Sequence, residues 1–135
     1  LVICNTNFAF RDKHMAFRMI WQQRRVTILY SGPVSDVQAA MAARLIQGEP
    51  RCDDIHEILH DGRACTSFTF SETVTEEIAA IDGAFAMSNK HLRIAVVSGD
   101  SDVIAAVRFY ESLKLSPLPI RVFADPEAAD SWLRA

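Results

Sequence analysis

The sequence predicts an α/β fold: a single domain with a mainly parallel sheet of about five strands, an N-terminal hairpin and four helices. The chain has 135 residues, which is enough for one hydrophobic core without disulfides or metals. Half of the residues are hydrophobic and 23% are charged, a composition that excludes intrinsic disorder. From residue 26 onward strand-like and helix-like segments alternate, which is typical of right-handed crossovers between parallel strands.

The chain divides into an N-terminal extension, residues 1–14, and an α/β domain, residues 15–135. The extension has no clean hydrophobic period, and the sequence leaves open whether it is ordered or adds an edge strand. At the start of the domain, the alternation of Phe17, Met19 and Trp21 predicts the first strand of a hairpin.

A polar turn and a strand over residues 26–30 complete the predicted hairpin. Ser31-Gly32-Pro33 is expected to break this strand. Ser35 then caps a helix over residues 36–47, which ends at Gly48-Glu49-Pro50. The apolar residues at helical spacing in this segment are Val37, Ala40, Met41 and Leu45.

Residues 55–60 are predicted to form a buried strand, followed by an exit at Asp61-Gly62. The next helix begins after Ser71, and we expect Thr73 and Glu76 to form its capping box. The apolar stripe of this helix consists of Val74, Ile78, Ile81 and Phe85.

Residues 92–97 have the composition of a central parallel strand that is covered on both faces. A third helix follows, and its apolar stripe ends at Leu113. The last strand covers residues 120–123, and Asp125-Pro126 starts a fourth helix. The Trp132-Leu133 pair of that helix is expected to pack on the sheet and close the core.

Composition also bears on partners and location. The net charge is −3, and the Lys and Arg residues are scattered, so a nucleic acid or an anionic membrane is not an expected partner. No apolar run approaches the ~18 residues of a membrane span. The three cysteines lack CxxC spacing, which indicates reduced thiols and a cytoplasmic location.

Several of these segments resemble the STAS-like domains, which have the anti-sigma-factor-antagonist fold. The residues that carry the resemblance are Ser31–Val34, Leu59–Arg63, Arg93–Val97, the helix ending at Leu113, and Arg121–Leu133. The resemblance covers roughly residues 15–135. It implies a small, non-enzymatic α/β regulator that binds proteins or small ligands.

The resemblance also implies a candidate phosphosite. In the phosphorylatable members, a serine lies just past the third strand in an Asp-Ser-Ser-Gly turn, where phosphate meets the N-terminus of the next helix. The matching turn here is Thr69-Phe70-Ser71-Glu72, which places Ser71 at that position. The aspartate and glycine of the turn are missing and Glu72 would repel a phosphate, so the alternative is that Ser71 only caps the helix.

In open parallel sheets, ligands bind where the carboxyl ends of the strands meet. The predicted strand exits supply six ligand-binding candidates: Ser31, Gly32, Asp61, Arg63, Ser98 and Asp100. The expected partner is a protein or a small molecule. We assign no catalytic residue, no metal and no cofactor.

The alternative function is a zinc-dependent hydrolase. His56-Glu57-Ile58-Leu59-His60 fits the HExxH pattern, in which two histidines on one helix face hold zinc and the glutamate polarises its water. On a strand, however, His56 and His60 would stand about 13 Å apart, too far to share an ion. The fold pattern predicts a strand here, so zinc remains the second hypothesis.

Two further hypotheses concern a magnesium site and a nucleophilic cysteine. Asp61, Asp100 and Asp102 lie at strand exits and are candidates for a magnesium site, although capping of the next helix explains Asp100 equally well. Cys65 lies near His60 in sequence, which suggests a nucleophile and base, but a packed thiol is the simpler explanation.

The N-terminal hairpin predicts a homodimer. Phe17, Met19 and Trp21 alternate with Arg18 and Ile20, which gives this strand more apolar surface than one small core needs. An edge strand of this kind is normally protected, for example by charged side chains, or it pairs with another strand. We therefore expect a two-fold dimer through the hairpin or the extension.

Overall fold

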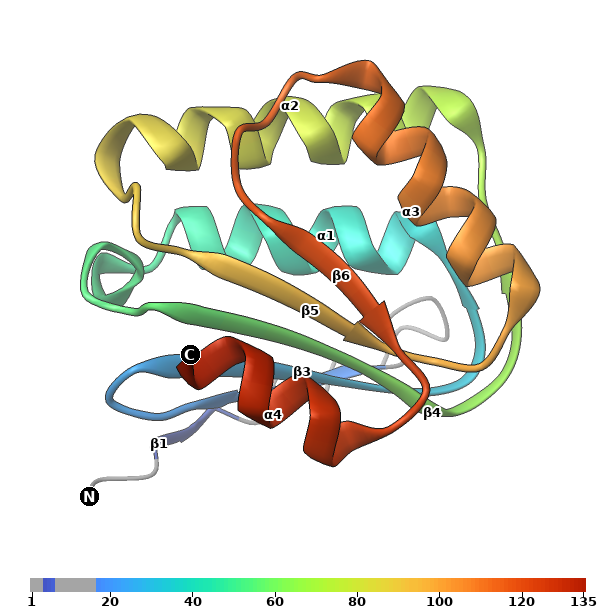
Figure 1. Ribbon diagram of the computed structural model, residues 1–135, viewed down its shortest axis with the longest axis horizontal. Coiled ribbons are helices and arrows are strands. Elements are labelled where there is room, and N and C mark those ends of the chain that lie inside the picture. Colours follow the sequence, from blue (N-terminus) through green and yellow to red (C-terminus); the bar gives the residue numbers. More distant parts are fainter. Residues whose placement is uncertain (1–3, 7–16) are drawn as a thin grey trace.

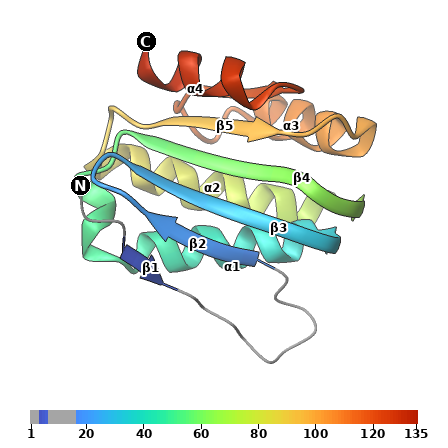
Figure 2. The same ribbon diagram turned by 90° about the horizontal axis from the view of Figure 1, so that it is seen from below.

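The structure, a computed structural model, describes residues 4–6 and 17–135. Its six described strands are β1 (Cys4–Thr6), β2 (Phe17–Trp21), β3 (Arg25–Ser35), β4 (Glu57–Thr69), β5 (Arg93–Val97) and β6 (Ile120–Phe123). They form one sheet in which the spatial order is the chain order, and Figure 2 shows this order for β1 to β5. The pairings of β1 with β2 and of β2 with β3 are antiparallel, and the others are parallel. The predicted α/β class, the mainly parallel sheet and the opening hairpin are confirmed.

The helices are α1 (Asp36–Gln47), α2 (Glu72–Ser88), α3 (Ser101–Leu113) and α4 (Pro126–Arg134), with a 3-10 turn η1 (Pro50–Asp53) after α1. Helices α1, α2 and α3 lie on one face of the sheet and α4 lies on the other (Figure 1). Among the described residues, no helix is long and apolar enough to cross a membrane.

Each helix begins next to a capping side chain, which explains why its start could be predicted. Ser35 and Gln38 form a capping box at α1, and Asp100 and Asp125 cap α3 and α4. The predicted capping box at α2 is wrong. Ser71 caps this helix instead, because its Oγ accepts a hydrogen bond from the Val74 amide.

Strands β3 and β4 continue beyond the predicted exits. Ser31, Gly32 and Pro33 lie inside β3, and Asp61, Gly62 and Arg63 lie inside β4. The pairing of the two strands shifts register between Leu29 and Ser31 and again between Gly32 and Pro33. Gly32 has a φ of 70°, so the glycine absorbs the irregularity while the two strands stay paired.

The apolar face of β2 is buried inside its own domain, which corrects the argument for a dimer. The exposed fractions of Phe17, Met19 and Trp21 are 4%, 2% and 2%. The Arg51 guanidinium covers the Trp21 ring at 4.7 Å from its centre. The core of the domain itself uses these three side chains, while Ile20 on the second face of β2 is only partly buried, and the homodimer stays an untested prediction.

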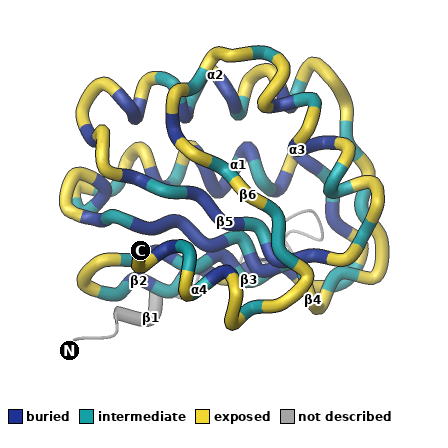
Figure 3. The backbone as a smooth tube through the Cα atoms, viewed as in Figure 1, coloured by how far each residue is buried: buried dark blue, intermediate teal, exposed yellow. Residues whose placement is uncertain are grey.

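The apolar interior consists of two clusters on opposite faces of the sheet. The large one joins β2 to β5 with α1, η1 and α2, and includes Trp21, Ile28, Ile46 and Ile94. The small one joins β4 and β5 to α4 through Leu59, Ala95, Val97, Ala129 and Leu133. Figure 3 shows that burial is concentrated along the middle strands, while the outer turns of the helices are exposed. Strand β5 is covered on both faces, as predicted, but it is fifth in order rather than central.

The segment 55–60 is an extended, largely buried segment, and its prediction as a strand is confirmed. Ile55 is buried, and β4 begins two residues later at Glu57. Ile58 belongs to the large cluster and Leu59 to the small one, as the alternation of a strand requires. Leu133 is buried against the sheet as predicted, while Trp132 is only partly buried beside Phe123.

Candidate functional site

A cavity of about 110 Å³ lies between the sheet and helices α2 and α3. Its wall is mostly apolar, with Ile94 and Val96 from β5 facing Val103, Ala106 and Val107 from α3. The residues of α2 that line it are Thr75, Ile78 and Asp82. Since these three span seven residues at 1.5 Å each, the cavity runs along about 10 Å of the helix. Gly62 and Ser98 line it near the carboxyl ends of β4 and β5.

Two aromatic side chains from neighbouring strands form the sheet side of this cavity. The Tyr30 hydroxyl lies 2.8 Å from His60 Nδ1, and the two rings are stacked at 5.9 Å between their centres. Burial lowers the pKa of His60 to about 4, so the imidazole is neutral at pH 7. Burial also raises the pKa of Tyr30. This pair therefore brings hydrogen-bonding groups to the cavity but no charge.

A buried carboxylate forms the helix side. Asp82 Oδ2 accepts a hydrogen bond of 2.6 Å from the Tyr110 hydroxyl, and Asp82 is 7% exposed. Burial raises the pKa of Asp82 to about 6, and the Tyr110 hydrogen bond only partly offsets that effect. Among the described residues, Tyr110 is the only hydrogen-bond partner of this carboxylate.

A second carboxylate lies at the other end of the cavity, where α1 and α2 begin. Asp36 is the first residue of α1 and is buried. Its Oδ2 accepts hydrogen bonds from the Ser71 amide (2.8 Å) and from the Thr75 hydroxyl (3.2 Å). The positive ends of two helices thus surround this carboxylate, which compensates its charge locally.

The Cys52 and Cys65 thiols are poor nucleophiles. Cys65 lines the cavity, and burial, together with the charges of Asp61 and Asp100, raises its pKa. Burial likewise raises the pKa of Cys52. A raised pKa keeps a thiol protonated, and the protonated form does not attack carbonyl or phosphoryl groups. The predicted packing role of Cys65 fits this environment better than the nucleophile hypothesis.

The six predicted ligand-binding residues lie at the carboxyl edge but split into separate groups. The Arg63 side chain binds the Asp61 carboxylate through Nε (3.0 Å) and Nη2 (2.8 Å). Burial alone would raise the pKa of Asp61, but these bonds and the charge of Arg63 lower it. Ser98 Oγ accepts from the Asp100 amide at 3.1 Å. Ser31 and Gly32 pair with Ala64 and Cys65 of β4.

Only part of that predicted set faces the cavity. Ser98 lines it, whereas Asp61 is held by Arg63 and Ser31 is exposed. Asp100 is occupied as the cap of α3, where Oδ1 accepts from the Asp102 amide at 2.8 Å. The edge therefore forms a polar rim, and of the six predicted residues Ser98 lines the cavity.

The geometry does not support the metal hypotheses. His60 faces Tyr30, while His56 precedes β4 and stacks on His91 at 6.0 Å between ring centres. The two histidines of the HExxH pattern thus have different neighbours. No cluster of three or more His, Cys, Asp or Glu side chains suited to a metal is found in residues 17–135.

Ser71 lies at the N-terminus of α2 and is exposed, as the phosphosite hypothesis requires. Its amide, however, already donates to Asp36, and its Oγ accepts from Val74. A phosphate on Ser71 would add negative charge beside Asp36 and Glu72, which favours the capping role. Phosphorylation of Ser71 itself is untested.

The cavity residues that matter most were not predicted as site residues. Asp82, Tyr110 and Tyr30 lie far apart in the sequence and meet only when α2 and α3 pack on the sheet. One sequence signal was available. Thr75, Ile78 and Asp82 have the helical spacing i, i+3 and i+7, so an acid occupies a position on an inward-facing stripe.

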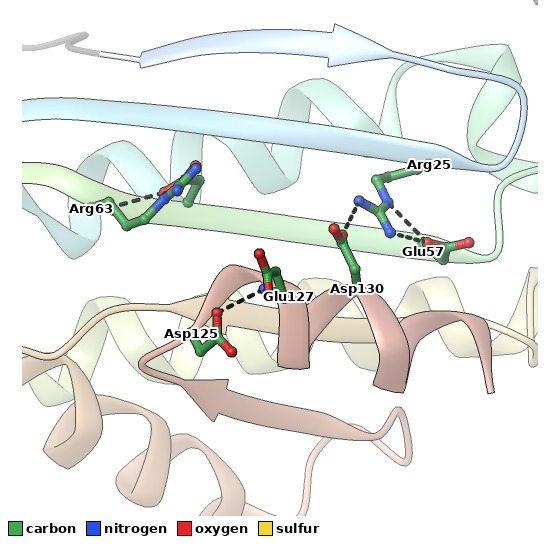
Figure 4. A network of polar contacts seen from close by, with 7 residues as sticks. Arg25, Glu57, Arg63, Asp125, Glu127 and Asp130 are labelled. Atoms are coloured by element: carbon green, nitrogen blue, oxygen red, sulfur yellow. Dashed lines mark hydrogen bonds and ion pairs between the residues drawn. The ribbon is translucent and has the colours of Figure 1, made fainter.

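The opposite face of the sheet carries a network of charged side chains (Figure 4). Arg25 Nε donates to Glu57 Oε1 (2.8 Å), and its Nη1 donates to Asp130 Oδ1 of α4 (2.6 Å). Nη2 also lies 2.6 Å from the same Glu57 oxygen, but without hydrogen-bond alignment. Arg93 Nη1 donates to the Trp132 carbonyl (2.7 Å), so arginines from two strands hold α4.

Together the sheet order, the helix layers and the opening hairpin define a small α/β domain of the STAS-like fold. The fold is that of the anti-sigma factor antagonist SpoIIAA in its unphosphorylated form, with a TM-score of 0.54 and 10% identity over 89% of this chain and 99% of that one. It is also similar to an uncharacterised DUF3478 protein with a SpoIIAA-like fold from Shewanella loihica PV-4. That comparison has a TM-score of 0.52 and 16% identity over 87% of this chain and 92% of the other.

At these identities the likeness shows the fold alone. No protein-family profile matches the chain, and no curated protein matches it in sequence.

Proposed function

We propose that this chain is a non-enzymatic regulatory domain that binds a small, mainly apolar ligand in the cavity between the sheet and helices α2 and α3. The observation that carries the proposal is the cavity itself. Protein interiors are close-packed, so an opening of about 110 Å³ amid a core of this size is a specific feature. An apolar cavity of ~150 Å³ is large enough to bind benzene. The space here fits a ligand with on the order of five or six non-hydrogen atoms.

The environment of the reactive side chains supports binding rather than catalysis. Burial keeps His60 neutral and Cys65 protonated, and the Asp82 carboxylate already accepts from Tyr110. For His60 to act as a base or Cys65 as a nucleophile, the opposite tuning would be needed, with a pKa near the working pH or a neighbouring group that removes the thiol proton.

A regulatory role is supported by the fold and by the rim. The anti-sigma factor antagonist with this fold is, by its name, a regulator. In this chain the exposed Arg63 and Ser31 lie at the carboxyl edge above the cavity. We place the surface for a protein partner at that edge, where a bound ligand would be sensed through Ser98.

The test is a thermal-shift titration of the full chain with small apolar molecules such as isopentyl alcohol. Saturation at about 100 times Kd contributes about 2.7 kcal/mol, which corresponds to a rise in Tm of roughly 5–10 °C for a domain of this size. Ala106→Leu should abolish the shift because it fills the cavity wall, whereas Ala128→Leu on the exposed side of α4 should keep it. No shift with any probe of this size would overturn the proposal.

A further inference from the structure

We infer that the cavity selects a small primary amine with an apolar body, and that its ammonium group binds the free oxygen of Asp82. This inference rests on the proposed function and names the chemical class of its ligand.

The cavity wall carries carboxylates and no cation. Asp36 and Asp82 line it, while no Lys or Arg is among its described lining residues. The one basic side chain there, His60, is neutral because of its burial. A wall of this kind repels anions and favours ligands that bring positive charge or hydrogen-bond donors.

The two carboxylates differ in how many hydrogen-bond donors the protein supplies to them. Asp36 accepts from the Ser71 amide and the Thr75 hydroxyl at the start of α2, so donors and the helix end compensate its charge. Asp82 lies ten residues into α2, away from either helix end, and receives a single neutral hydroxyl, that of Tyr110. Its other oxygen has no partner among the described residues.

A buried carboxylate without a cationic partner is costly, and a cation that pairs with it recovers part of that cost. Hydrogen bonds between ionised groups are also about twice as strong as neutral ones. An ammonium bound to Asp82 therefore supplies what the protein does not. The cavity wall also contains Val107, Ile94 and Ile120, which provide an apolar surface for the rest of the ligand.

The experiment compares three probes with the same branched five-carbon skeleton on the full chain at pH 7.5: isopentylamine, isopentyl alcohol and isovalerate. Binding is followed by amide chemical shifts in two-dimensional NMR. We expect isopentylamine to bind at least about tenfold tighter than the alcohol, and isovalerate not to bind. Asp82→Asn should weaken the amine at least about tenfold and change the affinity of the alcohol by less than about twofold.

Two further variants separate charge recognition from a structural effect. Asp102→Asn removes the same charge from an exposed position on α3 and should leave both affinities unchanged. Tyr110→Phe releases the Tyr110 hydrogen bond, so the amine should bind as well or better, whereas a purely structural role of the pair predicts weaker binding. This variant also keeps the inference testable if Asp82→Asn fails to fold.

The outcomes distinguish the two proposals. If the amine and the alcohol bind equally, or if Asp82→Asn weakens both alike, the cavity binds ligands but the inference about the amine is wrong. If none of the three probes binds, the proposed function fails together with it.

Discussion

The two faces of the sheet bury polar side chains in different ways. On the α1–α3 face, polar side chains are buried in neutral or half-satisfied pairs around a cavity, as with Tyr30 and His60. On the α4 face, Arg25 donates one hydrogen bond to Glu57 and one to Asp130, its Nη2 is buried without a hydrogen-bond partner, and the apolar cluster on this face is small. The comparison teaches that oppositely charged side chains fasten α4 to one face of the sheet, whereas on the other face buried polar groups without a cationic partner line a cavity.

The largest expected effect tests the α4 face. Arg25→Met leaves Glu57 buried without its partner, and removal of one member of a buried pair typically costs about 3–5 kcal/mol. The double variant Arg25→Met/Glu57→Leu removes both charges and should recover most of the loss. Urea denaturation measures both values. A single variant that loses less than about 1 kcal/mol would contradict the assigned role of the pair.

The second prediction concerns the α1–α3 face and the dependence of the free energy of unfolding on pH. The folded pKa of His60 is about 4, below its ordinary value of 6.5, so its contribution to stability is complete above pH 6.5 and is lost as the pH falls towards 4. The folded pKa of Asp82 is about 6, above its ordinary 3.8, so its contribution is complete below pH 3.8 and is lost as the pH rises through 6. The two groups therefore oppose each other between pH 4 and 6.5.

Single variants should separate the pH dependence of stability that comes from His60 from that of Asp82. Between pH 6.5 and 4, His60→Gln should gain roughly 2–3 kcal/mol relative to the wild type, and Asp82→Asn should lose a similar amount. The measurement is the free energy of unfolding in urea at pH steps of about 0.5 over this range. Parallel pH profiles for the two variants would show that these residues are not buried against the cavity as described.

The smallest expected effects compare the helix caps of the two faces. Ser71→Ala and Asp125→Ala should each cost about 1 kcal/mol, because each removes an acceptor for a helix amide. Since α2 belongs to the large cluster, Ser71→Ala should lower hydrogen-exchange protection throughout α1–α3. Asp125→Ala should affect mainly α4, and a global loss of protection would contradict this division.

The sequence was sufficient for the helices and much less so for the strands. Ser35, Asp100 and Asp125 act through local backbone amides, so the starts of α1, α3 and α4 follow from neighbouring residues. The ends of β3 and β4 were predicted too early, because Gly32 and Gly62 belong to residue types that usually mark turns. Pairing between the two strands, which is not a local property, keeps them extended.

The sequence predicted where the site lies in the fold but not which side chains form it. The carboxyl edge follows from the strand order, and Ser98 does line the cavity there. The partners of Asp82 depend on how α2 packs against α3, and Trp21 is buried because η1 brings Arg51 over it. Neither contact has a signature in the neighbouring residues of the chain.

The order of the strands has a consequence for how the protein is made. Every described strand pairs with the strand that precedes it in the chain, so each can join the sheet as it leaves the ribosome, without waiting for a later one. The exception is the contact between Arg25 and Asp130, which are separated by 105 positions. During translation the α1–α3 face is therefore expected to assemble first, and the guanidinium of Arg25 meets its last partner only when the final helix has been released.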